Sequence, residues 1–244
     1  VFMDYKKSIL LNAFVEYVRS VLSMVEQDFS YESVFRFLRT GFTEFTRDEI
    51  DRLENYVVAV GLRGYKKWQA VWARKTNRTD EEELAVLNGL RVRFVEMTES
   101  LVFVLKQRKK TVRDICEAVY RFFVENQIQE KLKVMENCFA EKKELALAKE
   151  YAQIYRIVLE LFDKFAELLG DEGISLKQYC ELLDAGLEEA KVGVIPPGMD
   201  QVVIGDVQRT RLKSNLKALF FVGANDTLLP GNMGQGGLLT ERDR

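Results

Sequence analysis

The sequence predicts a mainly α-helical fold, a multi-helix bundle with a small β remnant formed by the two chain ends. Apolar residues recur every three or four positions over most of the chain, N-cap signals precede several such stretches, and β-type runs occur only near the ends. The 244 residues are 47% hydrophobic and 30% charged, as in a globular protein with a substantial core. One or two domains are therefore expected.

Several helices begin with recognisable N-terminal signals. Ser30 precedes one helix, with Phe29 and Val34 placed to staple its first turn. A Ser or Thr followed three residues later by Glu or Gln is the capping-box pattern, which favours a helix start. It occurs at Thr46 with Glu49, Thr79 with Glu82, and Ser175 with Gln178.

The apolar spacing then predicts the helices in order. The first carries a stripe from Leu10 through Phe14 to Val25, the second follows Ser30, and the third has its stripe from Ile50 to Val60. Further helices are expected at about 80–107, 111–126, 128–141, 143–169 and 175–190. Amphipathic helices joined by short turns favour an antiparallel bundle.

The pattern changes at 193–198, where the sequence GVIPPG cannot continue a helix. After it come two β-type runs, VVI at 202–204 and ALFFV at 218–222, and the opening VFMD resembles the end of a buried strand. We expect these three segments to share one sheet, with the helices inserted between them. Because so few short strands are unstable alone, the rest of that sheet would lie outside this chain.

Domain boundaries follow from this arrangement. A helical domain is expected at 5–195, and a second, partial domain at 1–4 plus 196–244. Both ends of the chain read as cuts within a longer protein.

Composition narrows the possible functions. The chain has no histidine, so it cannot itself supply a Ser/His or Cys/His pair. Its cysteines, Cys116, Cys138 and Cys180, lie far apart in helical patterns and are expected to be reduced packing thiols of a cytoplasmic protein. No apolar run approaches the ~18 residues of a membrane span, so no membrane is expected as a partner. The net charge of −2 argues against a wholly basic nucleic-acid module, although a local basic patch is compatible with it.

The segment 62–78 is the most basic part of the chain, with six cations, no acid and three interleaved aromatic residues. Lys66, Lys67 and Trp68 are candidate DNA contacts, since lysines neutralise phosphates and rings stack on bases. The alternative is a solvated connector whose tryptophans anchor it to the bundle. A second basic cluster, at 106–113, lies where one helix ends, and cations there complement the helix dipole without any ligand.

No catalytic residue is assigned. The acidic runs at 81–83 and 188–189 are typical of solvated helix faces, and the phosphate-loop pattern GxxxxGK[ST] does not occur.

The segment 201–230 resembles part of the superfamily 1 helicases of the UvrD type, in which a strand, a polar loop and a second strand lead to a Gly-to-Pro exit. Gly205 and Asp206 stand near the usual Met-Thr, Gln208 stands near the usual His, and no Lys-Gly pair follows. With Arg209 and Arg211 after the first strand, this degenerate form closely resembles the AddB family, the B subunits of bacterial ATP-dependent helicase/nucleases. Segments 1–22, 31–68 and 236–244 support the same resemblance.

This resemblance implies an internal fragment of an AddB protein that acts in double-strand DNA break repair and recombination. The chain would be the helical accessory domain of a superfamily 1 helicase-like fold, itself non-catalytic, shaping the DNA path and inter-domain or inter-subunit contacts. DNA or inter-domain contact is implied for the loop residues Asp206, Gln208, Arg209, Arg211 and Lys213, and structural salt bridges are the alternative for its cations.

The resemblance also implies the cofactors and partners. No cofactor or metal is expected within this chain, and the family's ATP, Mg and iron–sulfur cluster would bind outside it. The implied partners are an AddA-type helicase/nuclease subunit and DNA. The alternative is a stand-alone helical scaffold or regulatory protein-interaction domain.

Overall fold

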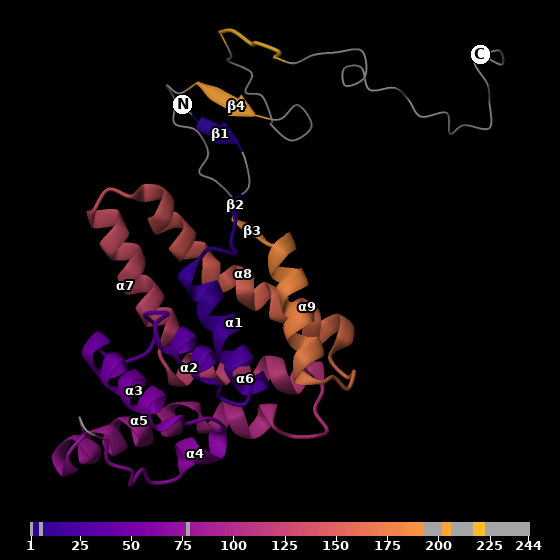
Figure 1. Ribbon diagram of the computed structural model, residues 1–244. Coiled ribbons are helices and arrows are strands. Elements are labelled where there is room, and N and C mark those ends of the chain that lie inside the picture. Colours follow the sequence, from indigo (N-terminus) through magenta and orange to yellow (C-terminus); the bar gives the residue numbers. More distant parts are fainter. Residues whose placement is uncertain (1, 5–6, 77–78, 193–201, 206–216, 223–244) are drawn as a thin grey trace. The chain divides into compact units, whose positions relative to one another are not determined.

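The computed structural model describes residues 2–4, 7–76, 79–192, 202–205 and 217–222 (Figure 1). Clustering of contacts divides the chain into two units, Val1–Val203 and Ile204–Arg244. Helices dominate the described part of the first unit, as predicted. They are α1 (Ala13–Glu26), α2 (Tyr31–Leu38), α3 (Arg47–Val60), α4 (Tyr65–Gln69), α5 (Glu81–Leu105), α6 (Val112–Glu125), α7 (Ile128–Glu141), α8 (Leu145–Leu169) and α9 (Leu176–Glu189).

The helix predictions are confirmed, with boundaries that differ by no more than two residues for α5 to α9. The capping boxes at Thr46 and Ser175 are both present, each with the side-chain and backbone hydrogen bonds of the motif. A further capping box, formed by Thr111 and Asp114 at the start of α6, was not predicted. Short helix α4 was not predicted either, because five residues are too few for a periodic pattern.

The predicted capping box of Thr79 with Glu82 is wrong. Asp80 is the N-cap of α5, and its carboxylate accepts a hydrogen bond from the backbone N–H of Glu83 at 2.8 Å. The Thr79 hydroxyl instead lies 2.7 Å from that of Thr76. A carboxylate is favoured at this position because it is charged and faces the positive end of the helix dipole.

The core of the bundle is rich in aromatic rings around α1. Tyr17 packs against the rings of Phe37 on α2, Phe42 in the loop that follows it, and Phe122 and Phe123 on α6. Helix α1 also packs along α2 and α9, while α5 packs on α6, and α8 packs on both α6 and α7 (Figure 1). The buried faces of α1, α3, α6, α8 and α9 consist mainly of apolar residues, as the helical periodicity predicted.

Two pairs of short strands join the ends of the described chain. β1 (Phe2–Asp4) is hydrogen-bonded to β4 (Val203–Gly205), which confirms that the opening residues and the 202–204 run form neighbouring strands. β2 (Lys7–Ser8) and β3 (Lys191–Val192) were not predicted; they pair antiparallel, with Lys7 opposite Val192. The helical part therefore begins and ends at adjacent places.

The prediction of a buried strand at 218–222 is wrong for this structure. These residues form no strand, and their apolar side chains are exposed, with Phe220 at 85% and Val222 at 94% of full exposure. A strand exists only where a neighbouring strand accepts and donates its hydrogen bonds. The domain limits at 5–195 and at 1–4 plus 196–244 stay a prediction.

Within the described ranges, no helix combines the length and the apolar character that crossing a membrane requires.

Candidate nucleic-acid interface

The basic segment 62–78 begins with two turns that only glycine adopts freely. Gly61 ends α3 with φ 68°, and Gly64 precedes α4 with φ 92°. A Cβ at Gly64 would lie 3.2 Å from Oδ2 of Asp28, so the chain passes close to that carboxylate. These turns fold α4 back onto the bundle.

Trp68 of α4 is buried, with 1% of its surface exposed. Its ring lies 4.6 Å from that of Phe94 and 5.2 Å from that of Trp72, measured between centroids. The indole N–H of Trp72 donates to the Lys67 carbonyl at 2.9 Å. A ring enclosed in this way has no free face for a base in this structure, so the structure does not support stacking by Trp68. The alternative, that the tryptophans anchor the connector, is confirmed.

Two polar residues of α5 hold α4 and the segment after it in place. Arg91 is buried, and its Nη1 donates to the carbonyl oxygens of Trp68 at 2.9 Å and Gln69 at 3.1 Å. Asn88 accepts from the backbone N–H of Trp72 and donates to its carbonyl, both at 2.9 Å. The orphan carbonyls at the end of a short helix are thereby satisfied.

The sequence interpretation missed Arg91, because a cation in a helix is usually solvated. The spacing of Arg91 from its apolar neighbours could have predicted its burial. Arg91 stands four residues after Leu87 and three before Phe94, both buried, so it lies on the buried stripe of α5. A cation on such a stripe must meet a hydrogen-bond acceptor.

Lys66 and Lys67 lie on the exposed side of α4. Within the described residues, neither ammonium group takes part in an ion pair with a carboxylate. Lys66 and Lys67 are thus exposed to solvent, while Trp68 is buried and anchors α4 to the bundle.

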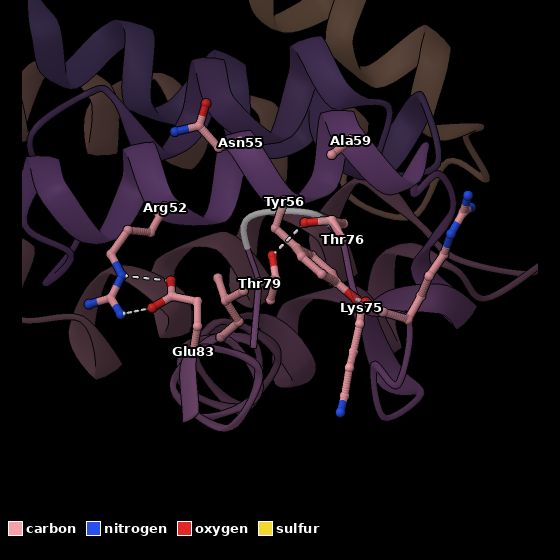
Figure 2. A pocket seen from close by; sticks show the side chains of 10 residues that line it. Arg52, Asn55, Tyr56, Ala59, Lys75, Thr76, Thr79 and Glu83 are labelled. Atoms are coloured by element: carbon pink, nitrogen blue, oxygen red, sulfur yellow. Dashed lines mark hydrogen bonds and ion pairs between the residues drawn. The ribbon is translucent and has the colours of Figure 1, made fainter. Parts of the chain in front are cut away.

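An open hollow of about 600 Å³ lies between α3, the beginning of α5 and residues 74–76 and 79 (Figure 2). The residues around it are largely polar, and two of its cations, Arg52 and Lys75, are paired with carboxylates. Arg52 forms a bidentate pair with Glu83, drawn as dashed lines in Figure 2, and Lys75 lies 2.6 Å from the carboxylate of Glu81. The hydroxyl of Tyr56 donates to the Arg74 carbonyl at 2.8 Å. The hollow therefore offers fewer free charges than α4 does.

The five candidate loop residues lie outside the described residues. They are Asp206, Gln208, Arg209, Arg211 and Lys213.

The three cysteines do not fit an iron–sulfur cluster. Cys116 is buried on α6, where its sulfur lies 3.2 Å from the Tyr179 hydroxyl. Cys180 is partly buried on α9, and burial raises its pKa to about 12 and also raises the pKa of Cys116. Metal ligation needs thiolates. No group of three or more metal-capable side chains occurs in the part of the chain that the structure describes.

Cys138 differs from the other two cysteines because it is exposed on α7. The prediction that all three are packing thiols is therefore wrong for Cys138. Its neighbour Phe139 packs on Tyr151 instead, which turns the Cys138 position away from α8.

Comparison with known proteins shows which proteins the chain is similar to. No family model matches it. It is 44% identical, over its whole length, to the B subunit of the ATP-dependent helicase/deoxyribonuclease of Lachnoclostridium phytofermentans, and 36% identical to the corresponding proteins of Clostridium novyi and Clostridium acetobutylicum. The chain covers 21–22% of these relatives, about a fifth of their length. Over its whole length, this chain is therefore similar to a stretch that makes up about a fifth of the B subunits of ATP-dependent helicase/deoxyribonucleases.

Proposed function

We propose that this chain is a helical part of an AddB-type protein that shapes the path of DNA and packs against neighbouring domains or an AddA-type helicase/nuclease subunit. The observation that carries the proposal is the identity of 36–44%, over the whole length of the chain, with B subunits of ATP-dependent helicase/deoxyribonucleases. The whole assembly would act in the repair and recombination of double-strand DNA breaks, in the cytoplasm. The chain's own contribution is structural and electrostatic.

In this proposal, catalysis belongs to other parts of the assembly. The sequence contains neither histidine nor a phosphate-loop motif, and the cysteines do not fit a cluster. ATP, Mg and the iron–sulfur cluster would therefore bind outside these 244 residues. An ATPase assay on the purified chain is expected to give no turnover above background, and robust turnover would contradict this part of the proposal.

Two places are proposed to meet DNA. One is the exposed side of α4, where Lys66 and Lys67 are free to contact phosphates. The other is the loop that contains Arg209 and Arg211, for which the support is the sequence resemblance alone.

The loop is tested in the complete helicase/nuclease complex. Arg209→Ala with Arg211→Ala is expected to weaken DNA binding and to lower its salt dependence, with little change in stability. The control removes two exposed lysines of α8, by Lys149→Ala with Lys164→Ala. Equal DNA affinity and salt dependence in both variants would remove the loop from the proposed DNA path.

A further inference from the structure

The two basic segments of the sequence meet at a single carboxylate. Lys106, the C-cap of α5, places its Nζ 2.6 Å from Oδ1 of Asp28, which follows α1. The same Nζ lies 5.0 Å from the ring centroid of Tyr65 and 5.9 Å from that of Phe29. Asp28 Oδ1 also accepts, at 3.5 Å, from the backbone N–H of Tyr65, the first residue of α4. The end of α5 and the beginning of α4 are therefore held side by side.

This junction gathers exposed cations from two parts of the chain. Each lies within three residues of Tyr65 or Lys106, so its backbone is within about 10 Å of the junction. From the α4 segment come Arg63, Lys66 and Lys67, and from the end of α5 and the loop after it come Lys106, Arg108 and Lys109.

Few acids oppose these cations. Asp28 is already paired with Lys106, and its carboxylate is the centre of the junction. Glu99 is exposed on α5 and close enough to Tyr65 for its charge to add to the burial that raises the pKa of that phenol. Glu26, near Asp28 in sequence, lines a separate small hollow with Cys180. Asp171 and Glu172 lie beside the far end of the α5–α6 loop, where the Asp171 carboxylate is 3.7 Å from Arg113 and the Glu172 carbonyl accepts from the Val112 N–H. Nearer Asp28, the exposed cations at 63–67 and 106–109 outnumber the acids.

The junction is built on a constrained backbone. Asp28 and Phe29 have φ of 46° and 56°, two consecutive non-glycine residues in the left-handed region. Such a conformation is unfavourable and persists where the surrounding contacts determine it. Here the Phe29 ring is fully buried, 4.7 Å from the ring of Tyr65. The backbone that carries these cations is therefore held in place by buried contacts.

The side chains of this surface favour a duplex phosphate backbone over single-stranded nucleic acid as the ligand. Its aromatic rings, Phe29, Tyr65 and Trp68, are all buried, so they offer no face for stacking on unpaired bases. What remains is exposed positive charge, which matches a phosphate backbone rather than single-stranded bases.

We infer that the α4 segment and the α5–α6 loop form one composite surface that binds the phosphate backbone of double-stranded DNA. This inference rests on the proposed role in the DNA path and adds the second half of the surface, at 106–109. It also predicts recognition without sequence preference, since phosphate contacts carry no base information.

Two paired substitutions in this chain test the composite surface. Lys66→Ala with Lys67→Ala removes charge from α4, and Arg108→Ala with Lys109→Ala removes charge from the loop after α5. The control, Lys149→Ala with Lys164→Ala, removes equal charge from α8. Binding to a labelled duplex of about 12 base pairs, roughly 40 Å long, is followed by fluorescence anisotropy over a range of salt concentrations.

Each surface pair is expected to weaken binding about tenfold and to reduce the slope of log K against log salt by about 2. The control pair is expected to change neither. A loop pair that behaves like the control, while the α4 pair weakens binding, would overturn the composite surface and leave the proposed DNA role intact. If none of the paired substitutions altered duplex binding, neither α4 nor the loop would be a DNA contact. Polyglutamate bound as tightly as duplex DNA would overturn the assignment to nucleic acid.

Asp28→Asn makes the surface more positive and should therefore strengthen DNA binding rather than weaken it. Asp28→Asn keeps an acceptor for the Tyr65 N–H but removes the one acid at the centre of the surface. The surface predicts that duplex binding becomes about two- to threefold tighter, with a steeper salt dependence. Weaker binding by this variant would mean that Asp28 acts only by holding the fold, and would count against the inference.

Discussion

The centre of the bundle and the α4 region both rest on buried aromatic rings, but they are held by different forces. In the centre, Tyr17 is surrounded by phenylalanine rings. Its hydroxyl has no hydrogen-bond partner within the described residues, and the same holds for the Tyr65 hydroxyl and the Trp68 indole N–H of α4, so the two regions differ in their backbone contacts rather than in these side-chain groups. In the α4 region, Trp68 and Trp72 are enclosed by hydrogen bonds from Arg91 and Asn88 to the adjacent backbone. Apolar packing dominates the first region and directional polar contacts the second.

Length explains the difference. Helices of fourteen residues such as α1 and α6 bury a continuous stripe against their neighbours, which stabilises them through area alone. Helix α4 has five residues, too few to be stable by itself or to bury such a stripe. Its position must therefore be set by side chains of another helix, and these are the contacts that orient Lys66 and Lys67.

The largest expected effect lies in the apolar centre. Phe14→Ala removes a fully buried ring that contacts those of Tyr17, Phe42 and Phe123, and should lower the free energy of unfolding by about 3–5 kcal/mol. Urea denaturation measures it. Phe103→Ala is the control, since Phe103 is 70% exposed, and should change stability by less than about 0.5 kcal/mol. Equal losses in the two variants would contradict the placement of the core.

The next effect lies in the polar clamp of α4. Arg91→Met leaves the carbonyls of Trp68 and Gln69 buried without a donor, which should cost about 2–3 kcal/mol. The loss should be local, with faster amide hydrogen exchange in α4 before the bundle unfolds and a red shift of tryptophan fluorescence.

Arg93→Met is the matched control for this clamp. Arg93 is a neighbouring, exposed arginine whose guanidinium lies over the ring of Phe45 and pairs with Glu49. Because exposed ion pairs contribute little, this variant should lose less than about 1 kcal/mol and leave exchange in α4 unchanged. Similar exchange in α4 for both variants would show that Arg91 does not position that helix.

A smaller effect of opposite sign is expected at Tyr17. Its hydroxyl is buried, and burial raises the pKa of the phenol. Tyr17→Phe removes the cost of an unpaired hydroxyl while keeping the ring, so stability should be unchanged or rise by up to about 1 kcal/mol. Tyr56→Phe is the comparison, since that hydroxyl donates to the Arg74 carbonyl and its loss should lower stability by about 1 kcal/mol. A large loss in Tyr17→Phe would reveal a partner for its hydroxyl.

Helix positions in this chain could be predicted because they depend on local patterns. The stripe from Phe14 to Val25 and the capping box at Thr46 need only neighbouring residues to act, and both were found in the structure. The sequence pattern did not predict that Asp80 rather than Thr79 would be the N-cap of α5. Both residue types are good N-caps, so the pattern alone does not distinguish two adjacent candidates.

The site was less predictable because it depends on contacts distant in sequence. The 62–78 segment was recognised as basic, but the burial of Trp68 depends on Phe94 and Arg91 of another helix. The meeting of that segment with Lys106 depends on Asp28, which no motif marks. Conversely, the 218–222 run has a strong β pattern and forms no strand, because strand formation also needs a neighbouring strand.

The smallest expected effect concerns the pH dependence of the Asp28 junction. The hydrogen bond from Lys106 lowers the pKa of Asp28 below its usual value. A carboxyl group with a depressed pKa in the folded state contributes stability above its unfolded pKa of about 3.9, and this contribution is lost as the pH falls through the folded value. Between about pH 4 and pH 2, the unsubstituted chain should therefore lose slightly more stability than Asp28→Asn does.

Urea midpoints measured at several pH values test this, with Asp163→Asn, an exposed residue of α8, as the control. The difference should be small, since the Asp28 side chain is 65% exposed and solvent screens its pair with Lys106. The control should follow the unsubstituted chain throughout. If Asp28→Asn followed it as well, the ion pair would not hold in solution, and the electrostatic link that joins α4 to the end of α5 would be lost with it. The α4 segment and the end of α5 would then be held together by the hydrogen bond from the Tyr65 N–H to Asp28 and by the Phe29–Tyr65 ring contact, and the ion pair would add nothing to that support.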